Sequence, residues 1–498
     1  MSCDLSCLPV NVLTQICHYL NFKDVCNCSR VSVAWREAFN NEEIWSWFYD
    51  KHFASRIGNN CSSNFILDSC SFVEPFLSLP TNESYRMSAL CESRLHCMLQ
   101  NLLDCNWSTG NFVAFKFRKG FAGEFGHIEC QENLLLDQNP YRGNSFTVWD
   151  ITGKPIELGS ITYSIDHHSH ATYFKFTESY VTVVQYNLLQ IYQKQNMWPM
   201  FRLKFRRLFD RPEEESQSIP NQEDITEWYN EYFLRQYMQN YRFCFCANAN
   251  YFAGSFYDRT PTIHVWDVES GSKQNEIVVP QPKGNVCKCI LVMNVKYLFI
   301  TLRIFHDSNT KNSTLIHSYD LKNEILTNLK LYFHAVDNVL FKNDFIISID
   351  EKKFKIDIYD NEYGQKLYSI KEQVDLFPQT VDIVHNFVYY AVGKRENDAC
   401  SDFEVKIKKL EKSAVTNFFH HTVKNLSNIY IYFIRQRFLL VSNWFNNYSK
   451  TSVIDTWNDQ KESASFDIEN ARAHCFEHHD SKILVQMADL SFRILHFY

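Results

Sequence analysis

The first fifty residues repeat apolar positions at the spacing of short amphipathic helices. Pro9 suits a helix start. The apolar residues that follow share one helical stripe: Val12, Leu13, Ile16, Tyr19 and Leu20. We expect a second short helix to begin after Asp24, and a third to carry Val31, Trp35, Ala38 and Phe39. A helical module over residues 4–50 is therefore predicted, with more apolar residues than so small a unit can bury alone.

The next segment reads as a linker, at residues 51–106. Residues 54–80 show no sustained period and include Gly58, Asn59 and Asn60, which is typical of an irregular connection. Helical spacing returns at residues 82–106 through these residues: Met87, Leu90, Leu95, Met98, Leu99 and Leu102. We predict a largely helical linker in 82–106 that joins two modules.

Beyond residue 110 the apolar period changes from that of a helix to that of a strand, and a short pattern recurs. Its clear copies end at Trp149-Asp150, Trp266-Asp267, Tyr319-Asp320 and Tyr359-Asp360. Weaker copies are found at 189–192, 405–408, 454–457 and 492–495. The copies are spaced mostly by about 40 to 50 residues, the length of a four-stranded blade.

This internal repeat predicts a mainly β fold, with a β-propeller over residues 107–498. Eight copies predict eight blades, or seven if the weak second or sixth copy forms no blade of its own. The alternating residues of Asn111 to Arg118 fit an outer strand that completes the last blade. An acidic and helix-like insertion at 210–240 follows the second blade. With only 13 glycines in the chain, the turns must rely on Asn and Asp.

Charge and cysteine content narrow the class of protein. The net charge of -7 arises from interspersed charges, so no basic face for nucleic acid or an anionic membrane is predicted. The residues Met1 to Leu20 match neither a secretory signal nor a transmembrane helix. The 17 cysteines are scattered, and pairs such as Cys26 and Cys28 would share one face of a strand, so they read as reduced, buried thiols. We expect an intracellular protein, in the cytoplasm, the nucleus or both.

The N-terminal residues closely resemble an F-box in order and spacing. The resemblance rests on Leu8-Pro9, Leu13, Ile16, Leu20, Asp24, Val31-Ser32, Trp35-Arg36 and Trp45. It implies a three-helix module that binds S-phase kinase-associated protein 1, the adaptor of SCF ubiquitin ligases, and through it cullin. The adaptor contact would then include Leu8, Pro9, Val12, Leu13, Ile16, Leu20, Val31 and Trp35.

The repeats add a second resemblance, because Gly126-His127 precedes Trp149-Asp150 as the Gly-His and Trp-Asp pairs do in WD repeats. The whole chain resembles the F-box/WD-repeat family. This implies a substrate-recognition subunit whose propeller binds the protein to be ubiquitinated for proteasomal degradation, phosphorylated or not. The alternative is an F-box propeller scaffold with a non-degradative role in protein interaction.

Candidate substrate-binding residues are cations in predicted connections between second and third strands, where one rim of such propellers binds partners. They are Arg142, Arg259, Lys352, Lys353 and Arg395. Guanidinium groups bind phosphate in a bidentate manner, which suits a phosphorylated peptide. No catalytic motif is found, so we expect a non-catalytic protein without a cofactor. The histidines at 167, 168, 170, 478 and 479 are expected in solvated turns and not at a metal site.

Overall fold

The computed structural model describes most of the chain from Leu8 to Phe497. Outside the described residues lie positions 1–7, 55–90, 118–127, 132, 139–144, 163–172, 178, 186–187, 196–200, 209–241, 258–261, 281–284, 306–312, 335–337, 343, 397–398, 412–413, 427, 446–447, 458–465, 470, 480–481, 488–491 and 498. The predicted insertion at 210–240, the predicted start of the linker helix at 82–90 and the Gly126-His127 pair therefore lie outside them.

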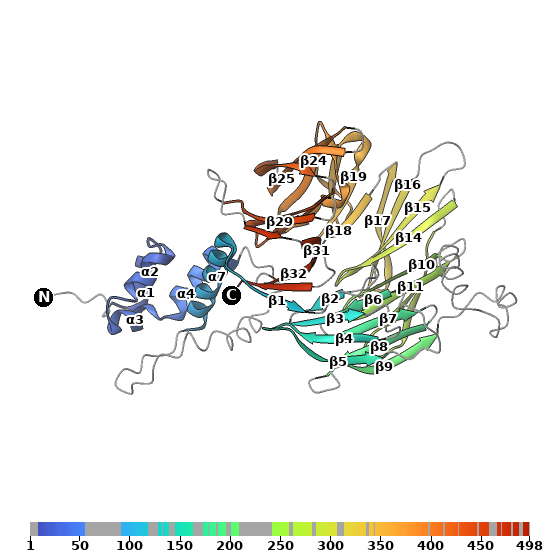
Figure 1. The fold of residues 1–498 in the computed structure, drawn as a ribbon. Helices are drawn as coiled ribbons and strands as arrows, with labels where there is room; N and C mark the ends of the chain where they lie inside the picture. The colour runs from blue at the N-terminus through green and yellow to red at the C-terminus, as the bar shows by residue number, and fades with distance from the viewer. Residues whose placement is uncertain are drawn as a thin grey trace. The chain divides into compact units, whose positions relative to one another are not determined.

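Short helices form the N-terminal module, followed by one long helix (Figure 1). Their bounds are α1 Val10–Cys17, α2 Phe22–Cys28, α3 Val33–Phe39, α4 Glu42–Tyr49, the π-helix η2 Asp50–Ala54 and α7 Glu92–Thr109. Helix α2 begins earlier than predicted, because Asn21 and Asp24 form a reciprocal capping box at its first turn. Cys26 and Cys28 accordingly lie in a helix, and the expectation of a strand there was wrong.

The rest of the described chain is mainly β and forms an eight-bladed β-propeller. Blade one contains, in sheet order, β2 Ile128–Gln131, β3 Leu134–Gln138, β4 Ser145–Asp150 and β5 Ile156–Thr162, and blade two contains β6 Tyr173–Phe176, β7 Tyr180–Gln185, β8 Leu188–Lys194 and β9 Phe201–Leu208. Blade three contains β10 Arg242–Ala247, β11 Tyr251–Tyr257, β12 Thr262–Asp267 and β13 Lys273–Val278. Blade four contains β14 Asn285–Met293, β15 Tyr297–Phe305, β16 Ser313–Asp320 and β17 Ile325–His334.

The last four blades follow the same antiparallel order with two variations. Blade five contains β18 Asn338–Lys342, β19 Phe345–Asp350, β20 Lys355–Asp360 and β21 Lys366–Lys371. In blade six, β22 Asp375–Leu376 and β23 Asp382–Val384 both pair with β24 Phe387–Glu396, which is followed by β25 Ala399–Glu411 and β26 Ala414–Leu426. Blade seven contains β27 Asn428–Ile434, β28 Phe438–Phe445, β29 Tyr448–Asp455 and β30 Phe466–Glu469, and blade eight contains β31 Ala471–His479, β32 Lys482–Met487, β33 Phe492–His496 and β1 Val113–Phe117.

Each copy of the sequence repeat lies at the third strand of a blade, which confirms the eight-blade assignment. In five blades the register between the third and fourth strands shifts beside the aromatic residue of the repeat: Trp149, Tyr192, Trp266, Tyr319 and Tyr359. A shift of this kind adds a residue to one strand and increases its local twist. The aromatic residue of the repeat therefore marks the register shift in these five blades, and the apolar residues mark the third strand itself.

Strand β1 completes the last blade, as its alternating sequence predicted. Val113 pairs with His496 and Phe117 with Phe492, so a strand from before the first blade lies beside β33. This pairing covers the β33 edge that would otherwise be exposed.

Asn and Asp side chains stabilise the turns where glycine is scarce. Asn248 accepts hydrogen bonds from the backbone N–H groups of Asn250 and Tyr251, and Asn294 binds the turn before Tyr297 in the same way. At the ends of third strands, Asp320 and Asp360 accept bonds from the turns that follow. The expected reliance on Asn and Asp is confirmed for these turns.

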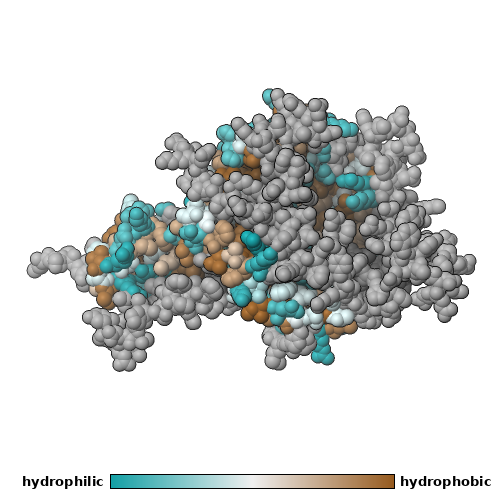
Figure 2. Space-filling model, viewed as in Figure 1, coloured by the Kyte–Doolittle hydropathy of each residue, from teal (hydrophilic) through white to brown (hydrophobic). Residues whose placement is uncertain are grey.

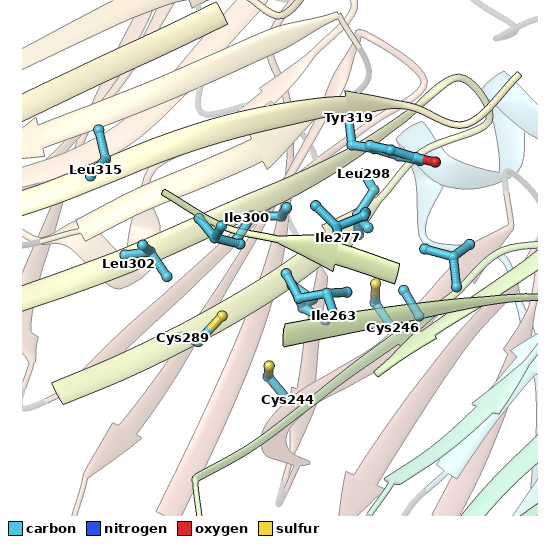
Figure 3. Close-up of a cluster of buried hydrophobic side chains, with 14 of the residues drawn as sticks. Cys244, Cys246, Ile263, Ile277, Cys289, Leu298, Ile300, Leu302, Leu315 and Tyr319 are labelled. Carbon is cyan, nitrogen blue, oxygen red and sulfur yellow. The ribbon is translucent and has the colours of Figure 1, made fainter. Parts of the chain in front are cut away.

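The described chain divides into two compact units. One contains the helices, β1 and strands β27–β33, and the other contains β2–β26. In the second unit, apolar side chains fill the space between consecutive blades. Between blades three and four, Cys244, Cys246 and Ile263 face Cys289 and Ile300 (Figure 3). Burying a single Ile or Leu side chain contributes about 1.5–3 kcal/mol, so these contacts hold neighbouring blades together.

The turn after β20 gives a test of the turn chemistry. We expect Asp360→Ala to lower the free energy of unfolding by about 1–3 kcal/mol, because the backbone N–H groups of Glu362, Tyr363 and Gln365 lose their acceptor. Asp360→Asn keeps one acceptor oxygen and should cost less. Chemical denaturation of the full chain measures both variants, and equal losses for Ala and Asn would contradict the interpretation.

Candidate functional site

The helical module has a small apolar core of its own. Side chains from all four short helices meet in it: Leu13, Cys17, Val25, Phe39, Ile44, Trp45 and Phe48. The indole N–H of Trp45 donates to the carbonyl of Phe39 at 2.6 Å, so the largest core residue is also hydrogen-bonded. Burial and nearby Cys28 raise the pKa of the Cys17 thiol to about 11, which keeps it protonated at neutral pH.

Several apolar side chains of this module remain on the surface. They lie on α1, between α1 and α2, and around the start of α3: Pro9, Val10, Val12, Tyr19, Val31 and Val33. We call these six residues the apolar face. Tyr19 is 89% exposed and Val31 is 66% exposed, so neither side chain contributes to the module's own core. Figure 2 shows apolar side chains on the surface over these helices.

The predicted adaptor-contact residues divide into three groups. Pro9, Val12 and Val31 are exposed, and Leu8, Ile16, Leu20 and Trp35 are partly buried. Leu13 is only 2% exposed and packs inside the module. Sequence reasoning did not select Val10, Tyr19 and Val33, although Tyr19 had been placed on the α1 stripe. A helical stripe identifies apolar positions, but it does not tell which of them the module itself covers.

The first half of helix α7 packs against the module as an additional helix. Cys97 lies in the module's core, where its Sγ contacts the carbonyl of Trp45 at 3.5 Å and burial raises its pKa to about 12. Arg94 lies over the Trp45 ring and donates to Oγ of Ser29 at 2.8 Å. Helix α7 therefore supplies the additional buried surface that the sequence indicated the module needs.

The second half of the same helix packs against blades seven and eight. The Trp107 ring stacks on Phe497 with 3.7 Å between centroids, and it also contacts Phe438. Asn106 Nδ2 donates to the carbonyl of Phe497 at 2.8 Å. One continuous helix thus has one end in the core of the module and the other in the core between two blades.

A buried ionic network joins the middle of α7 to the tight turn between β27 and β28. Asp104 accepts from Nε of Arg435 at 3.0 Å and contacts Arg437 at 3.4 Å. Gln100 Oε1 accepts from Nη2 of the same guanidinium at 2.6 Å. Burial alone would lower the pKa of Arg437, but its hydrogen bond to Asp455 raises that pKa above the ordinary value. Both arginines therefore pair with carboxylates inside this contact.

The backbone of the β27–β28 turn adopts an unfavourable conformation at Arg435, the residue that binds Asp104 and Gln100. Arg435 and Gln436 both have positive φ, 55° and 53°, which non-glycine residues rarely adopt. Two successive residues of this kind occupy the central positions of a tight β-turn, which the N–H of Arg437 closes by donating to the carbonyl of Ile434 at 3.1 Å. Their cost of about 1–2 kcal/mol each is offset by the hydrogen bonds of Arg435. We call α7 with these contacts the connecting helix.

The predicted substrate-binding cations are not gathered by the described part of the structure. Lys352 and Lys353 are exposed in the short 3-10 helix η7, Glu351–Lys353, between β19 and β20, where Lys353 pairs with Asp350 at 2.9 Å. Arg395 lies within strand β24 and not in a connection, so that placement was wrong. Arg142 and Arg259 lie outside the described residues, between β3 and β4 and between β11 and β12.

The histidines and cysteines give no metal site among the described residues, where no three His, Cys, Asp or Glu side chains are suitably grouped. His478 and His479 belong to strand β31, so the expected turn was wrong for them, and histidines 167, 168 and 170 lie outside the described residues. In the part of the chain that the structure describes, no helix has the length and apolar character needed to cross a membrane.

Comparison with known proteins matches the first part of the chain to a family. A family model described as F-box-like covers residues 5–51, which include α1 to α4. No curated protein matches the sequence. Among solved structures, Hsv2 from Kluyveromyces lactis aligns with 11% identity over 70% of this chain and 98% of its own, with a TM-score of 0.40.

Two further solved structures align at similar levels. Sqt1 from Saccharomyces cerevisiae has 9% identity over 73% of this chain and 92% of its own, with a TM-score of 0.42. BamB from Moraxella catarrhalis has 9% identity over 77% of this chain and 98% of its own, with a TM-score of 0.33.

The connecting helix gives a stability test. We expect Asp104→Ala to lower the free energy of unfolding by about 3–5 kcal/mol, because Arg435 stays buried without its carboxylate partner. The double variant Asp104→Leu, Arg435→Met should lose less, since no buried charge is left. Denaturant unfolding of the full chain compares the two, and a double variant less stable than the single one would contradict the account.

Proposed function

Because the chain carries an F-box-like domain at residues 5–51 and continues into an eight-bladed β-propeller, we propose that it is the substrate-recognition subunit of an SCF-type ubiquitin ligase. The helical module would bind the adaptor, S-phase kinase-associated protein 1, and through it cullin. The propeller would bind the protein to be ubiquitinated. The observation that carries the proposal is the connecting helix, which joins an adaptor-type module to propeller blades through buried contacts at both ends.

The apolar face supports the adaptor contact. Val12, Val31 and Val33 are exposed although they belong to a module with a complete core of its own. Covering such side chains on binding gains about 25 cal/mol for each Å² removed from water. The partly buried Leu8, Ile16, Leu20 and Trp35 would line the edge of this contact. Leu13 would act indirectly, by holding α1 in place.

The role of the connecting helix would be positional. In a ligase of this type the receptor performs no chemistry itself. It holds the bound protein near the rest of the ligase, which converts a bimolecular encounter into an intramolecular one. A flexible linker would spread the bound protein over many positions and dilute that effect. The Asp104 network and the Trp107 stack restrict rotation of α7 on blades seven and eight.

The partner-binding surface is proposed on the rim formed by connections between second and third strands. Lys352 and Lys353 are the described cations of that set, and both are exposed. The proposal assigns them to contacts with the bound protein, together with Arg142 and Arg259. The chain would act by positioning the bound protein and not by catalysis of its own.

Adaptor binding can be tested without disturbing the fold of the module. We expect Val12→Glu, Val31→Glu to abolish capture of the purified adaptor by the full chain, because both side chains are exposed and a buried carboxylate would lack a partner. Val278→Glu in blade three, at an apolar position about as exposed as Val31, is the matched control and should bind normally. Adaptor binding at wild-type strength by the double variant would refute this contact.

The recognition role has a separate test in cells. Proteins captured by both the wild type and Val12→Glu, Val31→Glu are candidates for the propeller partner. We expect such a partner to have a half-life at least about twofold longer when only the variant is present, since the variant holds the partner but not the ligase. Binding with an unchanged half-life would favour the non-degradative scaffold instead.

A further inference from the structure

Arg94 is a buried charged residue in the first turn of α7, only 7% exposed. Its Nη2 donates to Oγ of Ser29 at 2.8 Å, but its Nε and Nη1 have no hydrogen-bond acceptor among the described residues. The other buried ion of the same helix differs, because Asp104 pairs with Arg435 and Arg437. A buried charge without a partner is strongly destabilising, so the surroundings of Arg94 favour an anion.

The module holds the guanidinium of Arg94 in one orientation. Its Cζ lies 5.2 Å from the centre of the Trp45 ring, whose N–H is already bonded to Phe39. Ser29, which is itself buried, accepts from Arg94 and donates its own proton to the carbonyl of Cys26 at 2.8 Å. The remaining N–H groups of Arg94 are therefore preorganised for a ligand.

The charged groups around Arg94 make this part of the module positive. Burial lowers the pKa of Arg94, and Arg36 on α3 lowers it further, while nearby thiols partly oppose the change. Glu37 of α3 is exposed, and no hydrogen bond joins it to Arg94 in the described part of the chain. Glu42 accepts from the backbone N–H of Ser93 at 3.3 Å. Neither carboxylate thus neutralises the buried guanidinium.

We propose that Arg94 binds an oxyanion of the phosphate type, with Arg36 as a second cation beside it. The oxygens of such an anion accept charge-assisted hydrogen bonds from the open N–H groups of the guanidinium. The burial of Arg94 favours a compact group over an acidic segment of a protein. Around it, Cys26, Cys91 and Arg36 are only half-buried, which leaves a route from solvent at this edge.

The bound anion would strengthen the packing of the start of α7 on α2 and α3. It would do so because binding to the folded arrangement alone stabilises that arrangement. This inference does not depend on the proposed function, since it concerns contacts within the module and the connecting helix.

Hydrogen–deuterium exchange of the full chain tests the site with inorganic phosphate as the probe. Phosphate and chloride buffers are matched in ionic strength, so that general screening of charge is the same in both. We expect phosphate to slow amide exchange at the start of α7 and the end of α2 by about threefold or more. Equal exchange in the two buffers would overturn the proposal.

Substitutions of arginine locate the effect. Arg94→Met should abolish the response to phosphate and leave the stability to denaturant in chloride unchanged or higher, because a buried unpaired charge is gone. Arg36→Gln should reduce the response by about twofold or more, since one of two cations is lost. Arg30→Gln, at an exposed arginine of the same module, is the matched control and should respond as the wild type does.

Arg94→Lys serves if the Met variant fails to fold. It keeps the charge but loses the planar set of N–H groups, so we expect it to fold and to respond less to phosphate. A response of wild-type size in either Arg94 variant would overturn the proposal.

Two further probes identify the source of the anion. Phenyl phosphate carries the same group on a bulky ring, so protection by both phosphates would assign the site to a phosphate group on a larger molecule. Protection by inorganic phosphate alone would assign it to the free ion. Protection of the same amides by the purified adaptor, with no response to phosphate, would overturn the proposal, because Arg94 would then pair with a carboxylate of the adaptor.

Discussion

The buried ionic contact between Asp104 and the arginines of the β27–β28 turn is the constraint on which the first compact unit depends. Removing charged side chains from water is costly, and ion pairs and hydrogen bonds offset that cost. Here Asp104 meets Arg435 and Arg437, Gln100 accepts from Arg435, and Asp455 accepts from Arg437. A helix held only by apolar packing could rotate by small steps. Paired hydrogen bonds of fixed geometry allow one rotation of α7 on the blades.

The same helix explains why the N-terminal module is stable although it is small. Cys97 and Arg94 extend the module's core, while Trp107 belongs to the core between blades seven and eight. Two cores are thereby joined by one rigid rod, and neither end is a flexible tether. In the propeller, Asn and Asp side chains stabilise the turns by accepting hydrogen bonds from backbone N–H groups. This leaves the connections free to vary while the blades stay regular.

Much of the fold was predictable from local patterns. The apolar period located the four short helices approximately, the repeat located all eight third strands, and the alternation after Asn111 identified β1 as the closing strand. The register shift beside Trp149, Tyr359 and their equivalents was not foreseen, although the repeated aromatic residue was its signal. The start of α2 was misplaced because Asp24 was read as lying before the helix, when it lies in the first turn.

The candidate site was harder to predict for a physical reason. The pairing of Asp104 with Arg435 joins residues 331 positions apart, and no local pattern marks either of them. Leu13 and Val12 are adjacent apolar residues on one helix, yet the first is buried in the module and the second is exposed. Which of the two stays exposed depends on where α4 and α7 pack, and that is decided by the tertiary structure. The expected placement of Arg395 failed because strand β24 extends beyond its apolar residues.

Hydrogen–deuterium exchange of the full chain, with and without the purified adaptor, tests the central claim most directly. The account predicts that the backbone amides of α7 from Arg94 to Trp107 exchange as slowly as those of β28 and β33, because all three share buried contacts. It also predicts that the adaptor adds protection at α1 and at the start of α3. Fast exchange along α7, while β28 and β33 stay protected, would show a loose tether in place of a rigid connection and would contradict the account.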